Sequence, residues 1–121
     1  MISAVRGAIQ IARNDANDIL SGVNRLISSV FEQNGIDVPD IVSIQFSQTS
    51  DLTARNPATA LRTEGYREVP LFCSQEPEYE GSMPRIIRVM VTYNRTGDGK
   101  PIPVYLGGAR KLRSDLFSTR T

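Results

Sequence analysis

The strongest strand pattern of the chain is the stretch Arg85-Ile86-Ile87-Arg88-Val89-Met90-Val91-Thr92-Tyr93. Side chains of a strand alternate between two faces, so one face carries Ile87, Val89, Val91 and Tyr93 and the other Ile86, Arg88, Met90 and Thr92. Arg88 therefore lies in mid-strand between two apolar neighbours. It either extends to solvent from an edge strand or points into a pocket that needs a fixed cation, and the residues alone leave both interpretations open.

A long amphipathic helix is predicted upstream of this strand, from about Asp15 to Gln33. Asn14 or Asp15 can cap its start, and Asn34-Gly35 supplies a left-handed stop. Its apolar residues recur at helical spacing and are Ile19, Leu20, Val23, Leu26, Ile27, Val30 and Phe31. We expect this helix to cover one face of a sheet.

Four further strands are expected, at Ile2–Ile11, Ile41–Gln48, Val69–Cys73 and Ile102–Leu106. In the second of these, Val42, Ile44 and Phe46 should share a face. Pro70 interrupts the third, which we therefore place near an edge of the sheet. The fifth strand should return after a hairpin turn at Thr96-Gly97-Asp98-Gly99.

Two other segments connect these strands. Asn56-Pro57, a cap followed by proline at the first helical position, opens a short helix through about Arg62. Residues 75–84 are rich in glutamate, glycine and proline and predict a loop. The order of elements indicates one α+β domain over residues 1–121 with a single mixed five-stranded sheet, and a polar tail from about Ser114 that frays.

Composition excludes several kinds of partner. The 121 residues carry a formal net charge of +1, which gives no electrostatic case for nucleic acid or an anionic membrane as a partner. No apolar run is long enough to span a bilayer, and residues 1–10 lack the basic region and apolar core of a secretory signal. We therefore expect a cytoplasmic protein.

The chain has no histidine, which excludes Ser-His-Asp and Cys-His catalytic units and histidine-based metal sites. Cys73 is the only cysteine, so an intramolecular disulfide and a multi-cysteine metal site are also excluded. If the chain is an enzyme, we expect it to work without the usual acid–base residue.

Four residues besides Arg88 are candidates for function, and each has an ordinary structural interpretation. Cys73 lacks a histidine base and is more often a small buried apolar residue. Glu76 would ordinarily be a solvated loop carboxylate, and Tyr105 a core aromatic with its hydroxyl at the rim. Arg62 could simply favour the helix dipole. From the residues alone the chain is a small α/β domain that could bind a carboxylate-bearing ligand.

Taken together, these residues form a pattern that resembles the barrel-type (AroH class) chorismate mutases from Val5 to Leu116. Matching segments, in the order and spacing of the family, are Val5-Arg6-Gly7-Ala8, Thr49-Ser50-Asp51-Leu52, Asn56-Pro57-Ala58 with Arg62, Val69-Pro70 with Cys73, Gln75-Glu76, Ile87-Arg88-Val89-Met90, Val104-Tyr105-Leu106, and Leu112-Arg113 with Asp115-Leu116. The resemblance implies a homotrimeric pseudo-α/β-barrel of the chorismate mutase/RidA-like kind. Its active sites lie in clefts between subunits and convert chorismate to prephenate without a cofactor or metal.

The resemblance also implies roles for single residues. Arg88 matches the arginine that faces the ether oxygen of the substrate and is the principal catalytic group. Cys73 and Glu76 match the pair around the substrate hydroxyl, and Arg6 and Tyr105 match residues that bind a carboxylate.

Further substrate-binding positions implied by the family lie around the pocket mouth: the mobile-loop residue Arg62, the rim residue Phe72, and Leu112 and Arg113, which help to close the site. Three residues depart from the family pattern, namely Asn56 in place of an aromatic residue, Thr59 in place of a lysine and Phe72 in place of a threonine. Arg55 is the neighbouring candidate for the missing lysine charge.

Two rival functions stay open, and these departures support the first of them. The first is a catalytically weak or silent trimer that binds chorismate or prephenate, and the second is a structural trimer without a ligand. The composition is compatible with the enzyme, because the rearrangement moves no proton and needs no nucleophile. It needs a compact substrate conformer and positive charge at the ether oxygen.

Overall fold

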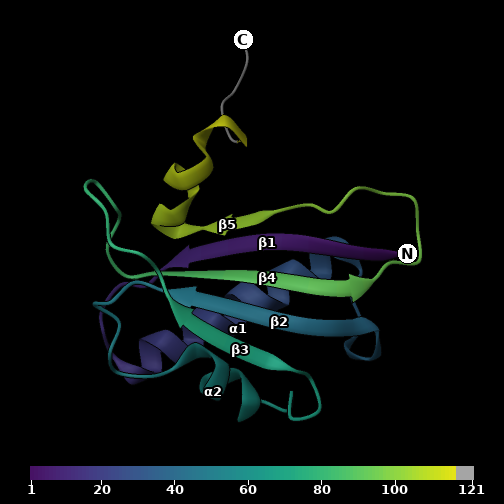
Figure 1. The fold of residues 1–121 in the computed structure, drawn as a ribbon, viewed down its shortest axis with the longest axis horizontal. Coiled ribbons are helices and arrows are strands. Elements are labelled where there is room, and N and C mark those ends of the chain that lie inside the picture. The colour runs from purple at the N-terminus through teal and green to yellow at the C-terminus, as the bar shows by residue number, and fades with distance from the viewer. Residues whose placement is uncertain (117–121) are drawn as a thin grey trace.

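The computed structural model describes the backbone of residues 1–116 and the side chains of residues 1–113. At its centre is a mixed five-stranded sheet in the order β3-β2-β4-β1-β5 (Figure 1). The strands are β1 (Ile2–Gln10), β2 (Ile41–Gln48), β3 (Leu71–Gln75), β4 (Ile86–Asn94) and β5 (Val104–Leu106). The α+β class and the mixed five-stranded sheet predicted from the sequence are confirmed.

Two α-helices pack on one face of this sheet, behind the strands in Figure 1. The helical segments are α1 (Ala16–Asn34), α2 (Pro57–Arg62) and two 3-10 segments, η1 (Val38–Asp40) and η2 (Gly107–Leu116). Asp15 is the cap of α1, because its carboxylate accepts hydrogen bonds from the backbone N–H groups of Asn17 and Asp18 at 3.0 and 3.1 Å. Gly35 ends the helix with φ +59°, as predicted. The opposite face of the sheet carries no α-helix of the described chain.

Strand β4 lies in the interior of the sheet, because it pairs antiparallel with β1 on one side and with β2 on the other. Its alternation is the one predicted: Ile87, Val89, Val91 and Tyr93 are buried under the helices, and Arg88 lies on the open face. Arg88 is therefore not an edge residue. Of the two interpretations of this arginine, the edge position is excluded.

The predicted hairpin between β4 and the fifth strand is wrong. β5 pairs in parallel with β1, from Gly7↔Val104 to Ile9↔Leu106. Both sides of β4 are already occupied by β1 and β2, so the returning chain must pass β1 and add to its outer edge. The connection, residues 95–103, starts with a backbone hydrogen bond of 2.8 Å from the Arg95 N–H to the Met1 carbonyl.

Two details of the other strands also differ from the prediction. β3 is an edge strand, as expected, but it begins after Pro70 and runs to Gln75, because proline has no N–H to donate to the sheet. Val42 does not share the buried face of Ile44 and Phe46 and is 41% exposed. A bulge between Ile41 and Ser43 changes the alternation at the start of β2.

At the C-terminal end, the backbone up to Leu116 belongs to η2, and the fraying from about Ser114 stays a prediction. The remainder of the predicted tail, residues 117–121, lies outside the described residues. Among the described residues, no helix has the length and apolar character needed to cross a bilayer.

Candidate active site

One row of paired residues crosses the open face of the sheet and takes one residue from every strand. In register order it is Ser74, Ser47, Arg88, Ala8 and Tyr105. Directly opposed side chains on one face of a sheet are near neighbours. Ala8 is fully buried, and its small side chain leaves room between Arg88 and Tyr105. The row therefore brings an arginine and a tyrosine to the two sides of one space.

A cavity of about 330 Å³ opens over this row. It is lined by three arginines, Arg6, Arg88 and Arg113, together with Tyr105 and residues of β1, β2, β3 and β4. Arg6 pairs with Met90 in the neighbouring row, so its side chain is diagonal to Arg88 on the same face. Three guanidinium groups around a cavity of this size favour a small ligand that carries carboxylates.

Glu76 is held beside Arg88 by the end of β3. The Glu76 N–H donates to the Gln48 carbonyl at 2.7 Å, which continues the β2–β3 pairing one residue beyond the strand. Glu76 thus shares the open face with Ser74, two residues earlier. Its Oε1 lies 2.9 Å from Nε of Arg88 and also accepts a hydrogen bond from the Ser47 hydroxyl. This ion pair uses Nε, and the terminal nitrogens of Arg88 make no hydrogen bond to the described residues.

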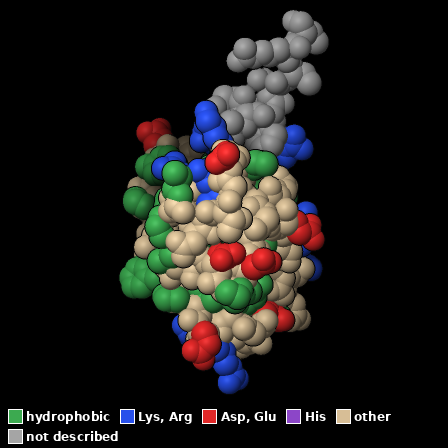
Figure 2. All heavy atoms as spheres, turned by 90° about the vertical axis from the view of Figure 1, so that its right-hand side faces the viewer, with side chains coloured by type: hydrophobic (Ala, Val, Ile, Leu, Met, Phe, Trp, Pro, Cys, Tyr) green, Lys and Arg blue, Asp and Glu red, His purple; other side chains and the backbone are tan. Residues whose placement is uncertain are grey.

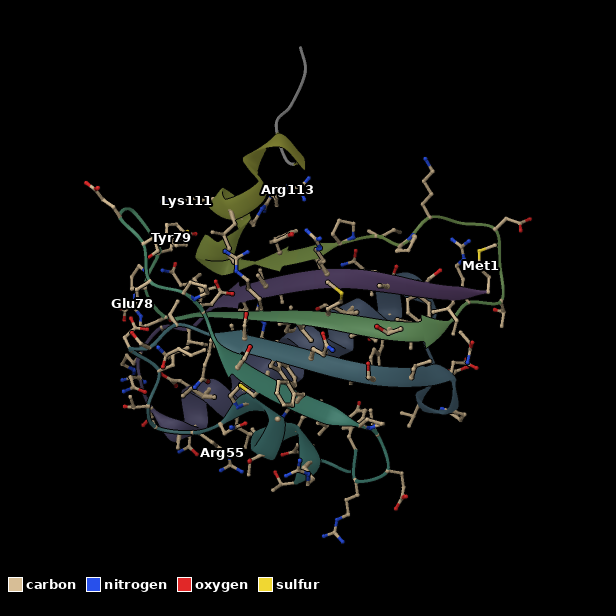
Figure 3. All side chains as sticks on the ribbon, viewed as in Figure 1. Met1, Arg55, Glu78, Tyr79, Lys111 and Arg113 are labelled. Carbon is tan, nitrogen blue, oxygen red and sulfur yellow. The ribbon has the colours of Figure 1, made fainter. Side chains whose placement is uncertain are left out.

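A small apolar cluster places η2 over one end of the open face. The cluster joins Ala8, Ile86 and Tyr105 of the sheet to Ala109 of η2, with Leu112 packed against it. Figure 3 shows Arg113 on η2, above the β5 edge of the sheet. Arg113 therefore reaches the cavity because η2 docks through its apolar side chains, whereas Leu112 packs in this cluster and is not among the residues that line the cavity.

The start of β4 is fixed by the matching segment Thr49–Asp51. The Ile86 N–H donates to the Thr49 hydroxyl at 3.0 Å, and the Arg85 N–H donates to the Asp51 carboxylate at 3.1 and 3.2 Å. Arg85 has φ +54°, a left-handed conformation that costs free energy for a residue with a side chain. These hydrogen bonds hold it there and so set the position of Arg88 three residues later.

Cys73 does not join this group. It pairs with Phe46, whose side chain is buried, and it packs against the core under the helices. Arg88 and Glu76 lie on the opposite face of the sheet. Burial raises the pKa of the Cys73 thiol, so the neutral form is favoured.

Arg62 and Phe72 are not among the residues that line the Arg88 cavity. Arg62 is exposed at the last position of α2, on the helix side of the sheet. Phe72 is 65% exposed on the open face of the edge strand β3. Within one chain, the structure thus gathers Arg6, Arg88, Tyr105 and Arg113 and leaves these two side chains outside the group.

The residues that depart from the family pattern have local partners. Asn56 caps α2, because its side-chain oxygen accepts from the N–H groups of Ala58 and Thr59 at 2.8 and 3.2 Å. Arg55 donates to the Thr63 hydroxyl at 3.4 Å, at the end of α2. Figure 3 places Arg55 on the α2 side of the molecule, far from Arg113. Arg55 therefore lies away from the Arg88 cavity of its own chain.

Sequence reasoning missed the polar residues of the neighbouring strands that line the cavity, Gln45, Ser47 and Ser74. A signal was present, since the alternation of β2 puts Gln45 and Ser47 opposite the buried Ile44 and Phe46. No group of three or more histidine, cysteine, aspartate or glutamate residues within the described part of the chain could hold a metal ion.

The fold and cavity define an α+β protein whose open sheet face carries a cavity lined by three arginines. The family model for chorismate mutase type I matches residues 2–116. The chain is 35% identical to the chorismate mutases AroH of Thermus thermophilus and of Bacillus subtilis, over 99% of its length and 100% and 96% of theirs. A solved chorismate mutase from Clostridium thermocellum superposes with a TM-score of 0.86 at 38% identity and covers 90% of this chain and 98% of that one.

The chain therefore belongs to the chorismate mutase type I family, the AroH class. Its activity is that of a chorismate mutase, an isomerase. Membership of the family also connects it with aromatic amino-acid biosynthesis.

Proposed function

We propose that the Arg88 cavity is the site where chorismate rearranges to prephenate, with Arg88 as the electrostatic catalyst. The observation that carries the proposal is the position of Arg88. It extends from an interior strand into a cavity and pairs through Nε with Glu76 at 2.9 Å. An arginine held by a rigid strand and an ion pair is preorganised, so it loses little free energy in reorienting during the reaction.

The reaction is intramolecular: one carbon–oxygen bond breaks while one carbon–carbon bond forms, and no proton moves. Negative charge grows on the ether oxygen as the first bond lengthens. A guanidinium next to that oxygen interacts more strongly with the transition state than with the ground state, which lowers the barrier. One such charged donor contributes about 3–4 kcal/mol in comparable enzymes.

The other cavity residues bind and orient the substrate. Arg6 and Arg113 are suited to hold its carboxylates, and Tyr105 is placed to add a hydroxyl donor. We assign Glu76 to the substrate hydroxyl. Holding a flexible dianion in the compact conformer supplies the proximity effect that the reaction needs.

We further propose that the protein is a homotrimer and that each site is shared between two subunits. The open sheet face supports this: Ile2 and Phe72 are 59% and 65% exposed on it. Figure 2 shows apolar side chains along the left side of the view, where this face lies. In the trimer, Arg62 and Phe72 of one subunit reach the cavity of its neighbour, which accounts for their position outside the cavity of their own chain.

Cys73 is not assigned a nucleophilic role, because its thiol packs against the core on the face opposite Arg88 and is favoured in the neutral form. We also propose a cytoplasmic location, with which a free thiol is compatible.

The direct test is the loss of the ultraviolet absorbance of chorismate during steady-state turnover. We expect saturable consumption by the purified protein and thermal stabilisation by prephenate or by a rigid bicyclic dicarboxylate analogue. Stabilisation without consumption would show a silent binding protein. If neither consumption nor stabilisation is observed, a structural trimer without a ligand is the remaining function.

A further inference from the structure

The hydroxyl of Ser47 has no role in the function described above, yet it contacts the ion pair at its centre. Ser47 lies on β2, between the strand that leads into Glu76 and the strand that carries Arg88 (Figure 1). It pairs with Ser74 on one side and with Arg88 on the other. Its hydroxyl donates to Oε1 of Glu76, the same oxygen that meets Nε of Arg88.

One oxygen of the Glu76 carboxylate is therefore held by a hydrogen bond from Ser47 and by the ion pair with Arg88. A carboxylate rotates readily about its terminal torsion, so a single ion pair does not fix which oxygen faces the guanidinium. With Ser47 and Arg88 both on Oε1, the other oxygen, Oε2, has no hydrogen-bond partner among the described residues. Glu76 is not among the residues that line the Arg88 cavity; it lines a second cavity, together with Glu78 and Tyr79.

We infer that Ser47 is a positioning residue for the reaction: it fixes the Glu76 carboxylate so that Oε1 supports Arg88 and Oε2 accepts from the substrate hydroxyl. This inference rests on the proposed roles of Arg88 and Glu76. Without the Ser47 hydroxyl, the carboxylate is free to turn toward the second cavity. Arg88 then loses its fixed partner. This weakens the stabilisation of the transition state, which depends most on the alignment of the guanidinium.

The test compares Ser47→Ala with Ser47→Thr, which keeps the hydroxyl. We expect Ser47→Ala to lower kcat about tenfold, the effect of losing one hydrogen bond to a charged group, with a smaller change in KM. Ser47→Thr should recover most of the lost rate. The matched control is Ser43→Ala, on the same strand and face but outside the cavity, which should keep wild-type kinetics. Thermal unfolding of each variant shows whether the fold is preserved.

A double-mutant cycle with Glu76→Gln separates positioning from a general effect on the sheet. If Ser47 acts through Glu76, Ser47→Ala should cause little further loss in the Glu76→Gln background. Independent, additive losses would overturn the inference, as would a Ser47→Ala kcat within twofold of wild type. The variant Arg88→Ala keeps the two proposals distinguishable. A normal rate in Arg88→Ala contradicts the proposed function. A strongly reduced rate in Arg88→Ala together with a normal rate in Ser47→Ala contradicts only the role of Ser47.

Discussion

At the scale of single residues, the environment of each side chain decides what it can do. Cys73 and Glu76 lie close in sequence, but they lie on opposite sides of the sheet. The thiol packs against the core, while the carboxylate pairs with Arg88. The alternation of side chains along a strand is the physical reason: residues separated by an odd number of positions point to opposite faces. Proximity in sequence therefore does not make this pair a catalytic unit within one chain.

The first prediction concerns this thiol. Because burial raises the pKa of Cys73, alkylation by iodoacetamide should be slower than for a free cysteine and should accelerate only at more alkaline pH. Cys73→Ser should stay active. The stability that the neutral thiol contributes is present below the ordinary thiol pKa and is lost as the pH rises through the raised value. Rapid alkylation at neutral pH, or complete loss of turnover in a folded Cys73→Ser protein, would argue for thiol chemistry.

At the scale of elements, the close approach of α1 to the sheet depends on Gly7. A Cβ at this position would lie 3.1 Å from Leu26 Cδ1 and from the Val104 carbonyl oxygen, and 3.2 Å from Val30 Cγ2. One of these neighbours belongs to the backbone of β5, which cannot move without a cost in free energy. Gly7 thus lets the helix pack directly over the strand that carries Arg6.

From this we predict that Gly7→Val lowers the free energy of unfolding by about 1–3 kcal/mol, the usual cost of overpacking a core. Chemical denaturation measures the change. Gly97→Ala is the control, since a Cβ there meets no atom within 4 Å and should leave stability nearly unchanged. Equal stability of Gly7→Val and wild type would show that the helix is not in tight contact at this point.

The elements differ in how well they could be predicted from the sequence alone. The helix α1 and the strand β4 were predictable because their apolar periodicity is long and regular. The partner of β5 was not, since pairing depends on which sheet edge is free, and the sequence near Thr96–Gly99 carries an ordinary turn signal. The bulge that exposes Val42 likewise could not be predicted from the pattern of alternating residues.

The same limit applies to the site. The position of Arg88 in mid-strand was a visible anomaly, and the resemblance supplied a role for it. The register that places Ser47 between Glu76 and Arg88 became visible only when three strands were aligned. Hydrogen bonds across strands depend on a register that no local sequence pattern specifies.

At the scale of the whole molecule, the uncovered sheet face and the positions of Arg62 and Phe72 point to an assembly. If sites are shared, an Arg88→Ala subunit and an Arg62→Glu subunit damage different halves of each site. Mixed trimers made by refolding the two variants together should then regain activity at roughly a quarter of the sites, those that receive both wild-type halves.

Chorismate turnover of the mixture, compared with that of each variant refolded alone, measures this recovery. Light scattering gives the oligomeric state of the same samples. A monomer in solution, or a mixture no more active than its parents, would show that the site is contained in one chain.

The central claim is that the charge of Arg88 acts on the transition state more than on the bound substrate. Its most direct test is the kcat of folded Arg88→Ala, measured at saturating chorismate against wild type. We expect a loss of about 10²–10³ or more in kcat, with unfolding temperature and oligomeric state unchanged. A folded Arg88→Ala protein with kcat near that of wild type would contradict it.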